Sequence, residues 1–211
     1  MLRIMIMMTG ISISLCYGIQ SLTALLFILY RKMNNTWFIR VANHSFFLYV
    51  ILWNPIMKFK ILTVGHPGNP HIQALADDYQ KRIRRYASLS LNAVKPVRIK
   101  SLSDAQIKEQ ESEKLQAGLT GHGPVMALHA GGELLSSEEW AEMFNQYARQ
   151  SSRQITFVIG GALGLTPEFL KKASRCLSLS PMTLPHELTL VVLLEQIYRV
   201  QTILKGEPYH K

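Results

Sequence analysis

The sequence predicts an α/β fold in which a mostly parallel sheet is covered by helices on both faces. Three observations support this prediction. From residue 57 onward, short runs with strand character alternate with longer segments whose apolar residues recur at helical spacing. The apolar runs are nearly continuous, which is typical of strands buried on both faces. The pattern repeats five times, as in layered α/β domains.

The first half of this region contains two strand and helix pairs. Residues 59–64 read as a strand, and apolar side chains recur at helical spacing over 72–86. Residues 89–99 form a weaker predicted strand, which we expect at a sheet edge because Pro96 cannot donate to a strand ladder. The next predicted helix, over 103–118, is polar.

The second half contains three further units. Ser136 and Glu139 have the spacing of a capping box and open a helix that buries aromatic residues. Thr166 with the proline after it marks another helix start. The remaining predicted elements are strands over 124–129, 155–159 and 176–180 and an apolar helix over 188–204.

Ligands of parallel α/β sheets bind outside the carboxyl ends of the strands. The loops after Leu128, Ile159 and Ser180 are therefore the candidate binding loops.

The first 56 residues differ in composition from the rest. They hold four of the 23 basic residues and none of the 14 acidic ones, so the formal charge of +9 divides into +4 and +5. The uncharged stretch over 4–30 is long enough for a membrane helix, whereas the apolar patch over 46–53 is too short to span alone. A cleaved signal peptide fits less well. We favour a misassigned start over a membrane anchor, because Met57 leads directly into a strand, and so expect a working domain over 57–211.

Cysteine content and charge narrow the compartment and the partner. The two cysteines, Cys16 and Cys176, form neither a CxxC motif nor a metal-binding spacing with histidine, which fits a reducing compartment. The positive charge of the second region permits an anionic partner such as RNA, although solubility alone also explains it.

The stretch ITFVIGGALGLTPEFL, residues 155–170, joins a strand to a helix through a glycine-rich turn. It matches neither the GxGxxG pattern nor a phosphate-gripping GxxxxGK[ST] loop. Glycine lets a backbone approach a ligand closely, so a binding loop and a structural turn are about equally compatible with this stretch alone.

The segment LSLSPMTLPHEL, residues 177–188, is more unusual. Its two prolines stiffen a loop that exposes backbone amides and carbonyls, and such groups can read an adenine edge without charged side chains. His186 lies near the start of the last helix, where a helix cap is favoured over an active group when the residue is considered alone.

Glu195 and Arg199 have the i,i+4 spacing of an ordinary helix ion pair. The tail after them ends on Tyr209, His210 and Lys211, and terminal tails are usually poorly ordered. Neither feature indicates a function by itself.

The segments VIGGALGL, SLSPMTLPHEL, LLEQIYR and GEPYHK, in this order, resemble the bacterial ribosomal RNA large-subunit methyltransferase H family of the SPOUT class. KFKILTVG and SSEEWA also match, so the resemblance covers residues 57–211. It implies a deep C-terminal trefoil knot, a cytoplasmic homodimer and S-adenosyl-L-methionine as methyl donor. It also implies methylation at N3 of a pseudouridine in 23S rRNA on assembled ribosomes.

The resemblance also assigns residues. The active-site positions would be His186, Arg199, Tyr209 and His210. The cofactor pocket would comprise Leu128, Gly160, Leu179, Ser180, Pro181, Met182, Thr183 and Leu184. In this interpretation Gly160 serves the cofactor through close backbone approach, whereas Gly164 belongs to a turn.

The residue types suit the implied chemistry. A sulfonium methyl is already electrophilic, so the enzyme must align it with the ring nitrogen and help that nitrogen lose its proton. Our hypothesis is that His210 or Tyr209 contacts the target base while Arg199 holds phosphate or the developing charge.

Two positions depart from the family pattern. The family typically has Asp where this chain has His129 and Arg where it has Leu190. An arginine at 190 would be expected near the RNA or the cofactor, and leucine can neither pair with phosphate nor stabilise an anion. The alternative function is therefore a non-catalytic RNA- or ribosome-binding relic of the same fold, and a third alternative is a membrane-tethered protein that uses residues 1–56.

Overall fold

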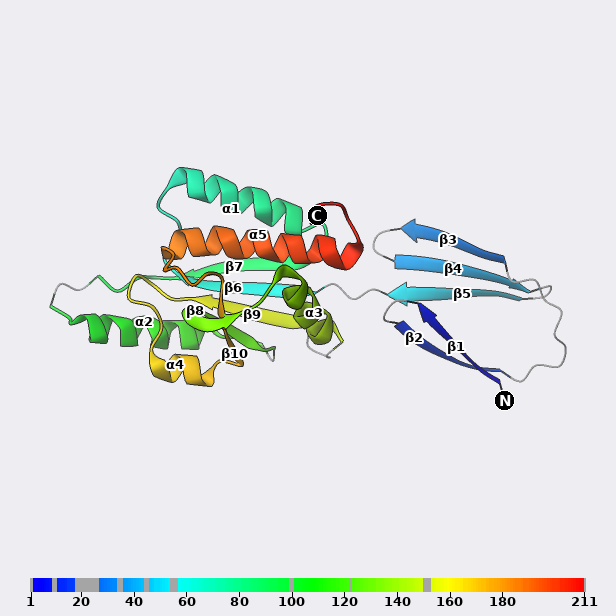
Figure 1. The fold of residues 1–211 in the computed structure, drawn as a ribbon, viewed down its shortest axis with the longest axis horizontal. Coiled ribbons are helices and arrows are strands. Elements are labelled where there is room, and N and C mark those ends of the chain that lie inside the picture. The colour runs from blue at the N-terminus through cyan, green and yellow to red at the C-terminus, as the bar shows by residue number, and fades with distance from the viewer. Residues whose placement is uncertain are drawn as a thin grey trace. The chain divides into compact units, whose positions relative to one another are not determined.

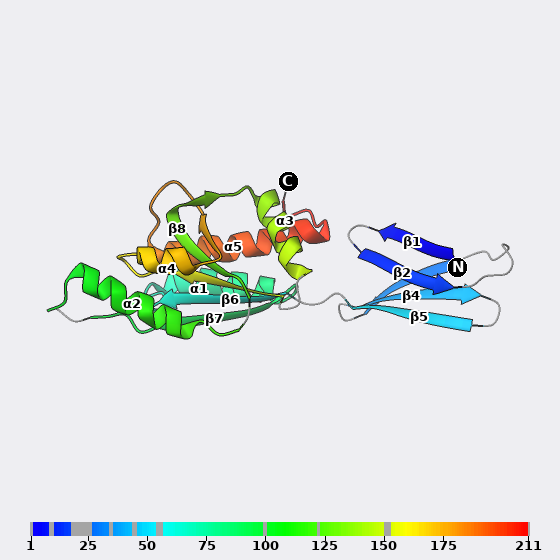
Figure 2. The same cartoon turned by 90° about the horizontal axis from the view of Figure 1, so that it is seen from below.

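The computed structural model describes residues 57–98, 101–121, 123–149 and 153–210, together with five strands in the segment before them. The chain divides into two compact units, Met1–Asn54 and Pro55–Lys211. Figures 1 and 2 show the ribbon from two directions.

The described residues of the first unit form antiparallel strands. β1 (Leu2–Met8) pairs with β2 (Ile11–Tyr17), while β4 (Thr36–Asn43) lies between β3 (Phe27–Met33) and β5 (Phe46–Trp53). The sequence allowed a membrane helix over 4–30, of which residues 9–10 and 18–26 lie outside the described part. No helix in the described part of the chain is long and apolar enough to cross a membrane.

The second unit is a five-stranded sheet in the order β10-β8-β9-β6-β7 with every pairing parallel. This arrangement confirms the predicted α/β class. The strands are β6 (Lys58–Val64), β7 (Ser88–Val94), β8 (Val125–Leu134), β9 (Gln154–Ile159) and β10 (Arg175–Ser178). The weaker strand is β7, and it lies at an edge as expected and ends before Pro96.

Five helices cover this sheet. They are α1 (Pro70–Ile83), α2 (Asp104–Gly118), α3 (Ser137–Ala148), α4 (Pro167–Lys172) and α5 (His186–Lys205). In Figure 1, α1 and α5 lie along one face of the sheet, with α2 and α4 on the other. The predicted capping box at the start of α3 is formed, because Ser136 accepts from the Glu139 amide and Glu139 accepts from the Ser136 amide.

The strands bury side chains on both faces, as near-continuous apolar runs require. On β6, Phe59 and Ile61 pack into the main core with α1, α3 and α5, while Leu62 and Val64 pack into a second core with α2 and α4. The main core is rich in aromatic residues, with the Phe59 and Phe144 ring centroids 4.9 Å apart. The sheet is therefore rigid on both sides, and its strand ends hold the loops after them in fixed positions. The trefoil knot implied by the resemblance stays a prediction.

Candidate functional site

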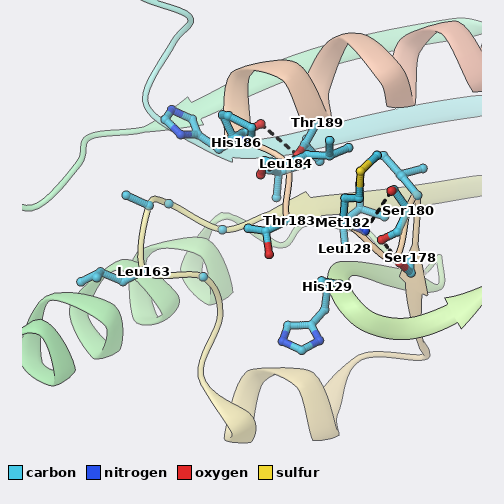
Figure 3. A pocket seen from close by; sticks show the side chains of 18 residues that line it. Leu128, His129, Leu163, Ser178, Ser180, Met182, Thr183, Leu184, His186 and Thr189 are labelled. Atoms are coloured by element: carbon cyan, nitrogen blue, oxygen red, sulfur yellow. Dashed lines mark hydrogen bonds between the residues drawn. The ribbon is translucent and has the colours of Figure 1, made fainter.

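The segments after Leu128, Ile159 and Ser180, which the sequence singled out as loops, meet around one cavity beside the carboxyl ends of β9 and β10. The expectation of a loop after Leu128 was wrong, because β8 continues to Leu134 and the first segment lies inside that strand. The volume of the cavity is about 600 Å³, within the range of small-molecule sites. The lining residues come from 128–130, 159–164 and 178–189, and none of them is an Asp, Glu, Lys or Arg. In Figure 3 the imidazole rings of His129 and His186 stand on opposite sides of Thr183 and Leu184.

A break in the β8 ladder supplies the first wall. On the β9 side β8 is regular, since Leu128 pairs with Ile159. On the β10 side the register shifts: Cys176 pairs with Ala127, but the next residue, Leu177, pairs with Glu133. The residues between therefore leave the β10 ladder and curve outward, as at a β-bulge. His129 is exposed in this curve, and its Nδ1 accepts from the Gly131 amide at 3.1 Å.

The glycine-rich turn supplies the second wall. A Cβ at Gly160 would stand 2.7 Å from the carbonyl carbon of Gly164, so the space is filled by the chain itself. Gly164 has a φ of 76°, a left-handed conformation that favours glycine, which agrees with the predicted turn. The structure thus gives a reason for glycine at 160 in the close approach of the turn's own backbone, while its role at the cofactor stays a prediction.

The proline-flanked loop supplies the third wall. Ser180 Oγ accepts from the Met182 amide at 3.0 Å, and Ser178 donates to the Ser180 carbonyl at 2.8 Å, so the loop is folded on itself. Met182 stays 71% exposed at the mouth.

The helix after this loop begins differently from the expectation. Pro185 is the N-cap of α5 and provides no side-chain cap, and His186 is the first helical residue. The interpretation of His186 as a helix cap was therefore wrong. The α5 terminus leaves first-turn amides without side-chain partners beside the cavity.

A second cluster surrounds the C-terminal tail. Glu195 Oε1 accepts from Arg199 Nε at 3.0 Å and from the Tyr209 hydroxyl at 3.1 Å, which also confirms the predicted ion pair within α5. The Arg199 guanidinium carbon lies 4.8 Å from the Tyr209 ring centroid. His210 Nε2 lies 2.7 Å from Glu138 on α3, and its Nδ1 lies 3.5 Å from Arg199 Nη1.

These contacts shift the pKa values of the cluster. Burial, followed by hydrogen bonds to Tyr79 and Glu195, raises the pKa of Tyr209 well above its ordinary value. This direction agrees with the phenol acting as a hydrogen-bond donor to Glu195. The bond to Glu195 raises the pKa of Arg199. A backbone hydrogen bond, followed by the contact with His210, lowers the pKa of Glu138.

The part of the chain that contains both clusters is similar in sequence to known proteins. A family model described as "Predicted SPOUT methyltransferase" matches residues 57–210. The chain belongs to the SPOUT methyltransferase family. The family expected from the motifs is thereby confirmed.

The relatives of this SPOUT methyltransferase chain agree in name. A protein of Gemmatimonas aurantiaca called "Ribosomal RNA large subunit methyltransferase H" is 40% identical over 155 residues, which is 74% of this chain and 100% of that protein. One of the same name from Limosilactobacillus fermentum is 41% identical over 159 residues, with the same coverage. A solved structure of a probable methylase family protein from Haemophilus influenzae covers 74% of this chain and 70% of that chain at 17% identity and a TM-score of 0.42.

The residues expected at the cofactor lie together in the SPOUT chain. All of them line the cavity except Pro181, and His186 lines it as well. The sequence did not single out Ser178 or Thr189, which also line it. The sequence could have indicated Thr189, because it follows His186 by about one helical turn and so lies on the same side of the helix.

The other three expected active-site residues lie elsewhere in the same chain. Arg199, Tyr209 and His210 belong to the tail cluster and do not line the cavity. Arg199 follows His186 by 13 positions on α5, which corresponds to about 20 Å along the axis. Glu138, which holds His210, had no sequence signal beyond its helix.

The two departures from the family pattern lie in different environments. His129 lines the cavity, whereas Leu190 is 1% exposed and packs in the main core. We expected that an arginine at position 190 would lie near the RNA or the cofactor. The leucine at this position instead packs among apolar residues.

Proposed function

We propose that this SPOUT methyltransferase transfers a methyl group from S-adenosyl-L-methionine to N3 of a pseudouridine in 23S rRNA on assembled ribosomes. The observation that carries the proposal is the neutral cavity formed by the family's motif loops. The names of relatives that match over their whole length support large-subunit rRNA as the substrate. Because ribosomes are the target, we propose a cytoplasmic location.

The cavity fits the proposed cofactor in size and chemistry. A nucleotide triphosphate would find no lysine or arginine among the lining residues. An adenosine group instead suits apolar walls with exposed backbone amides and carbonyls, and a carboxylate suits the amides at the start of α5. The residues that would hold the cofactor are Leu128, Gly160, Leu179, Ser180, Met182, Thr183 and Leu184, with Pro181 keeping their loop stiff.

When bound, S-adenosyl-L-methionine supplies an electrophilic methyl group on its sulfonium. The residues of the chain must then position the target base and lower the cost of removing its proton. Tyr209 serves as a hydrogen-bond donor: an ordinary phenol already holds its proton at neutral pH, and the raised pKa of Tyr209 makes its ionisation still less favourable. His210 is the better proton acceptor of the two, and Arg199 stabilises the negative charge that develops on the base.

The distance between the two clusters supports a homodimer. Within one chain the tail cluster lies about 20 Å along α5 from the cavity, too far for one base to touch both. A second copy that presents its own Arg199, Tyr209 and His210 at the cavity would complete the site. His210 would then contact the base either after its hydrogen bond to Glu138 breaks or with that bond still in place.

The experiment is incubation of the purified protein with ribosomes lacking the modification and with radiolabelled S-adenosyl-L-methionine. We expect labelling of large-subunit rRNA by wild type and a loss of at least a hundredfold for His210→Ala, since acid–base groups contribute about 10²–10⁴-fold. Full activity of His210→Ala would remove that residue from the mechanism. The same assay on residues 57–211 tests whether this region is the complete catalytic unit, as we propose.

A second candidate is the non-catalytic relic of the fold. His129 and Leu190 favour it, because two positions typical of the family have changed chemistry. Cofactor binding without methyl incorporation would support the relic.

A further inference from the structure

A basic surface lies at the end of α1, away from the cavity. Lys81, Arg84 and Arg85 are exposed, and none of the three forms an ion pair with another residue in the described part of the chain. Of the nearby carboxylates, Asp78 pairs with Arg82, Glu207 accepts from the Tyr86 hydroxyl, and Asp77 accepts from the side-chain amides of Gln73 and Gln80. The three basic side chains, which we call the α1 basic surface, therefore present positive charge to solvent without an ion-pair partner among the described residues.

The backbone under this surface is ordered. Arg84 keeps a right-handed helical conformation after α1, and the amides of Arg85 and Tyr86 bond back to the carbonyls of Arg82 and Ile83 at 3.2 and 2.8 Å. The cationic groups thus extend from a fixed turn and not from a flexible loop, so less entropy is lost when they bind a ligand.

A row of tyrosines connects the α1 basic surface to the tail. The Tyr86 ring lies 6.0 Å from that of Tyr198, which lies 4.7 Å from that of Tyr209. Burial, followed by the hydrogen bond to Glu207, raises the pKa of Tyr86 to about 12, so its hydroxyl keeps the proton that it donates to the tail. The basic surface is therefore held two ring contacts from the residues proposed to meet the target base.

Basic residues at the end of a helix can also serve only to stabilise that helix, so α1 is compared with another helix end. Cations in the last turn stabilise the helix macrodipole, each by about 0.3–1 kcal/mol. α4 shows this arrangement alone, with exposed Lys171 and Lys172 in its last turn and no part in the tyrosine row. The α1 basic surface differs from α4 in two ways: Arg84 is the C-cap of α1 with Arg85 beyond the helix, and the tyrosine row connects this surface to the tail cluster.

We propose that Lys81, Arg84 and Arg85 dock the phosphates of the RNA strand that flanks the target nucleotide. Guanidinium groups bind phosphate in a bidentate manner, and such contacts fix the register of the strand without reading its sequence. This inference rests on the proposed function, because it assumes an RNA substrate at the tail cluster.

The test compares two variants of the full chain that remove the same charge at helix ends. Arg84→Gln/Arg85→Gln changes the α1 basic surface, and Lys171→Gln/Lys172→Gln changes α4. The dissociation constant is measured for protein-free 23S rRNA and for intact ribosomes over a salt series. Each lost phosphate contact lowers the slope of log K against log salt by about 0.7 on a single strand, so we expect a fall of about 1.4 for the α1 variant. The α4 variant should match wild type.

Equal effects of the two variants would overturn the proposal, since general charge would then explain binding. A loss on ribosomes but not on protein-free rRNA would also overturn it, by indicating a protein partner. Binding of S-adenosyl-L-methionine should be unchanged in both variants. Methyl incorporation by wild type is scored separately: its absence would refute the proposed function, whereas the RNA-binding comparison decides the docking surface.

Discussion

Replacing Gly160 by alanine tests whether the glycine turn forms the cofactor wall. The new Cβ would stand 2.7 Å from the Gly164 carbonyl carbon and 3.0 Å from its oxygen. Both are backbone atoms held by the bond from the Gly164 amide to the Gly161 carbonyl at 3.0 Å, so the turn must open. Overpacking of this kind costs about 1–3 kcal/mol.

Two measurements follow from that shift. The unfolding midpoint should fall by about 2–4 °C for each kcal/mol in a protein of this size. The dissociation constant for S-adenosyl-L-methionine, measured by calorimetry, should rise on the order of tenfold, which is about 1.4 kcal/mol. Gly68→Ala is the matched control, because its Cβ would meet only Glu187 Oε1 at 3.6 Å, an ordinary contact. Unchanged cofactor affinity in a folded Gly160→Ala protein would refute the assignment of this wall.

Three further predictions concern other parts of the site. Glu138→Gln should lower the unfolding midpoint more at pH 7 than at pH 3, because the folded-state pKa of Glu138 is depressed: its contribution is fully present above the ordinary value of 4.5 and declines as pH falls toward and through the folded value. An equal loss at both pH values would show that charge is not involved. Leu190→Arg should destabilise the fold on the order of 3–5 kcal/mol in urea unfolding, because the position is 1% exposed among apolar residues; a wild-type midpoint would mean that the arginine reaches solvent or a partner. Mixing Gly160→Ala and His210→Ala proteins, at a cofactor concentration well below the dissociation constant of Gly160→Ala, should raise methyl transfer above the sum of the two proteins alone if the two clusters come from different protomers; no such gain after subunit exchange would count against the shared site.

The sequence predicted the strands and helices themselves, but not every irregularity within them or every helix boundary. The residue patterns predicted the five parallel strands and their helices, because continuous apolar runs are typical of strands buried on both faces and apolar residues at helical spacing are typical of helices with one buried face. The break in β8 could not be predicted, since it depends on how β10 pairs on both sides of an outward curve. The helix start at His186 was misread as a cap because a prolyl N-cap leaves no side-chain signal.

The site was predicted in part for a similar reason. The cavity residues belong to three short segments of the chain, so the motifs in those segments were enough to predict most of them. The contacts of the tail depend on tertiary packing between α1, α3 and α5, and nothing in the spacing of residues 206–211 indicated that His210 would meet Glu138. The pattern of family motifs identified the residue types but not the distance of about 20 Å that separates the two groups.

Nucleoside analysis by mass spectrometry tests the proposed function most directly. Ribosomes that lack the modification are incubated with the purified protein and S-adenosyl-L-methionine, and the 23S rRNA is then digested to nucleosides. We predict one new methyl group per large subunit, carried at N3 of a pseudouridine. No methylated pseudouridine from a protein that binds both the cofactor and the ribosome would contradict the account and favour the non-catalytic relic.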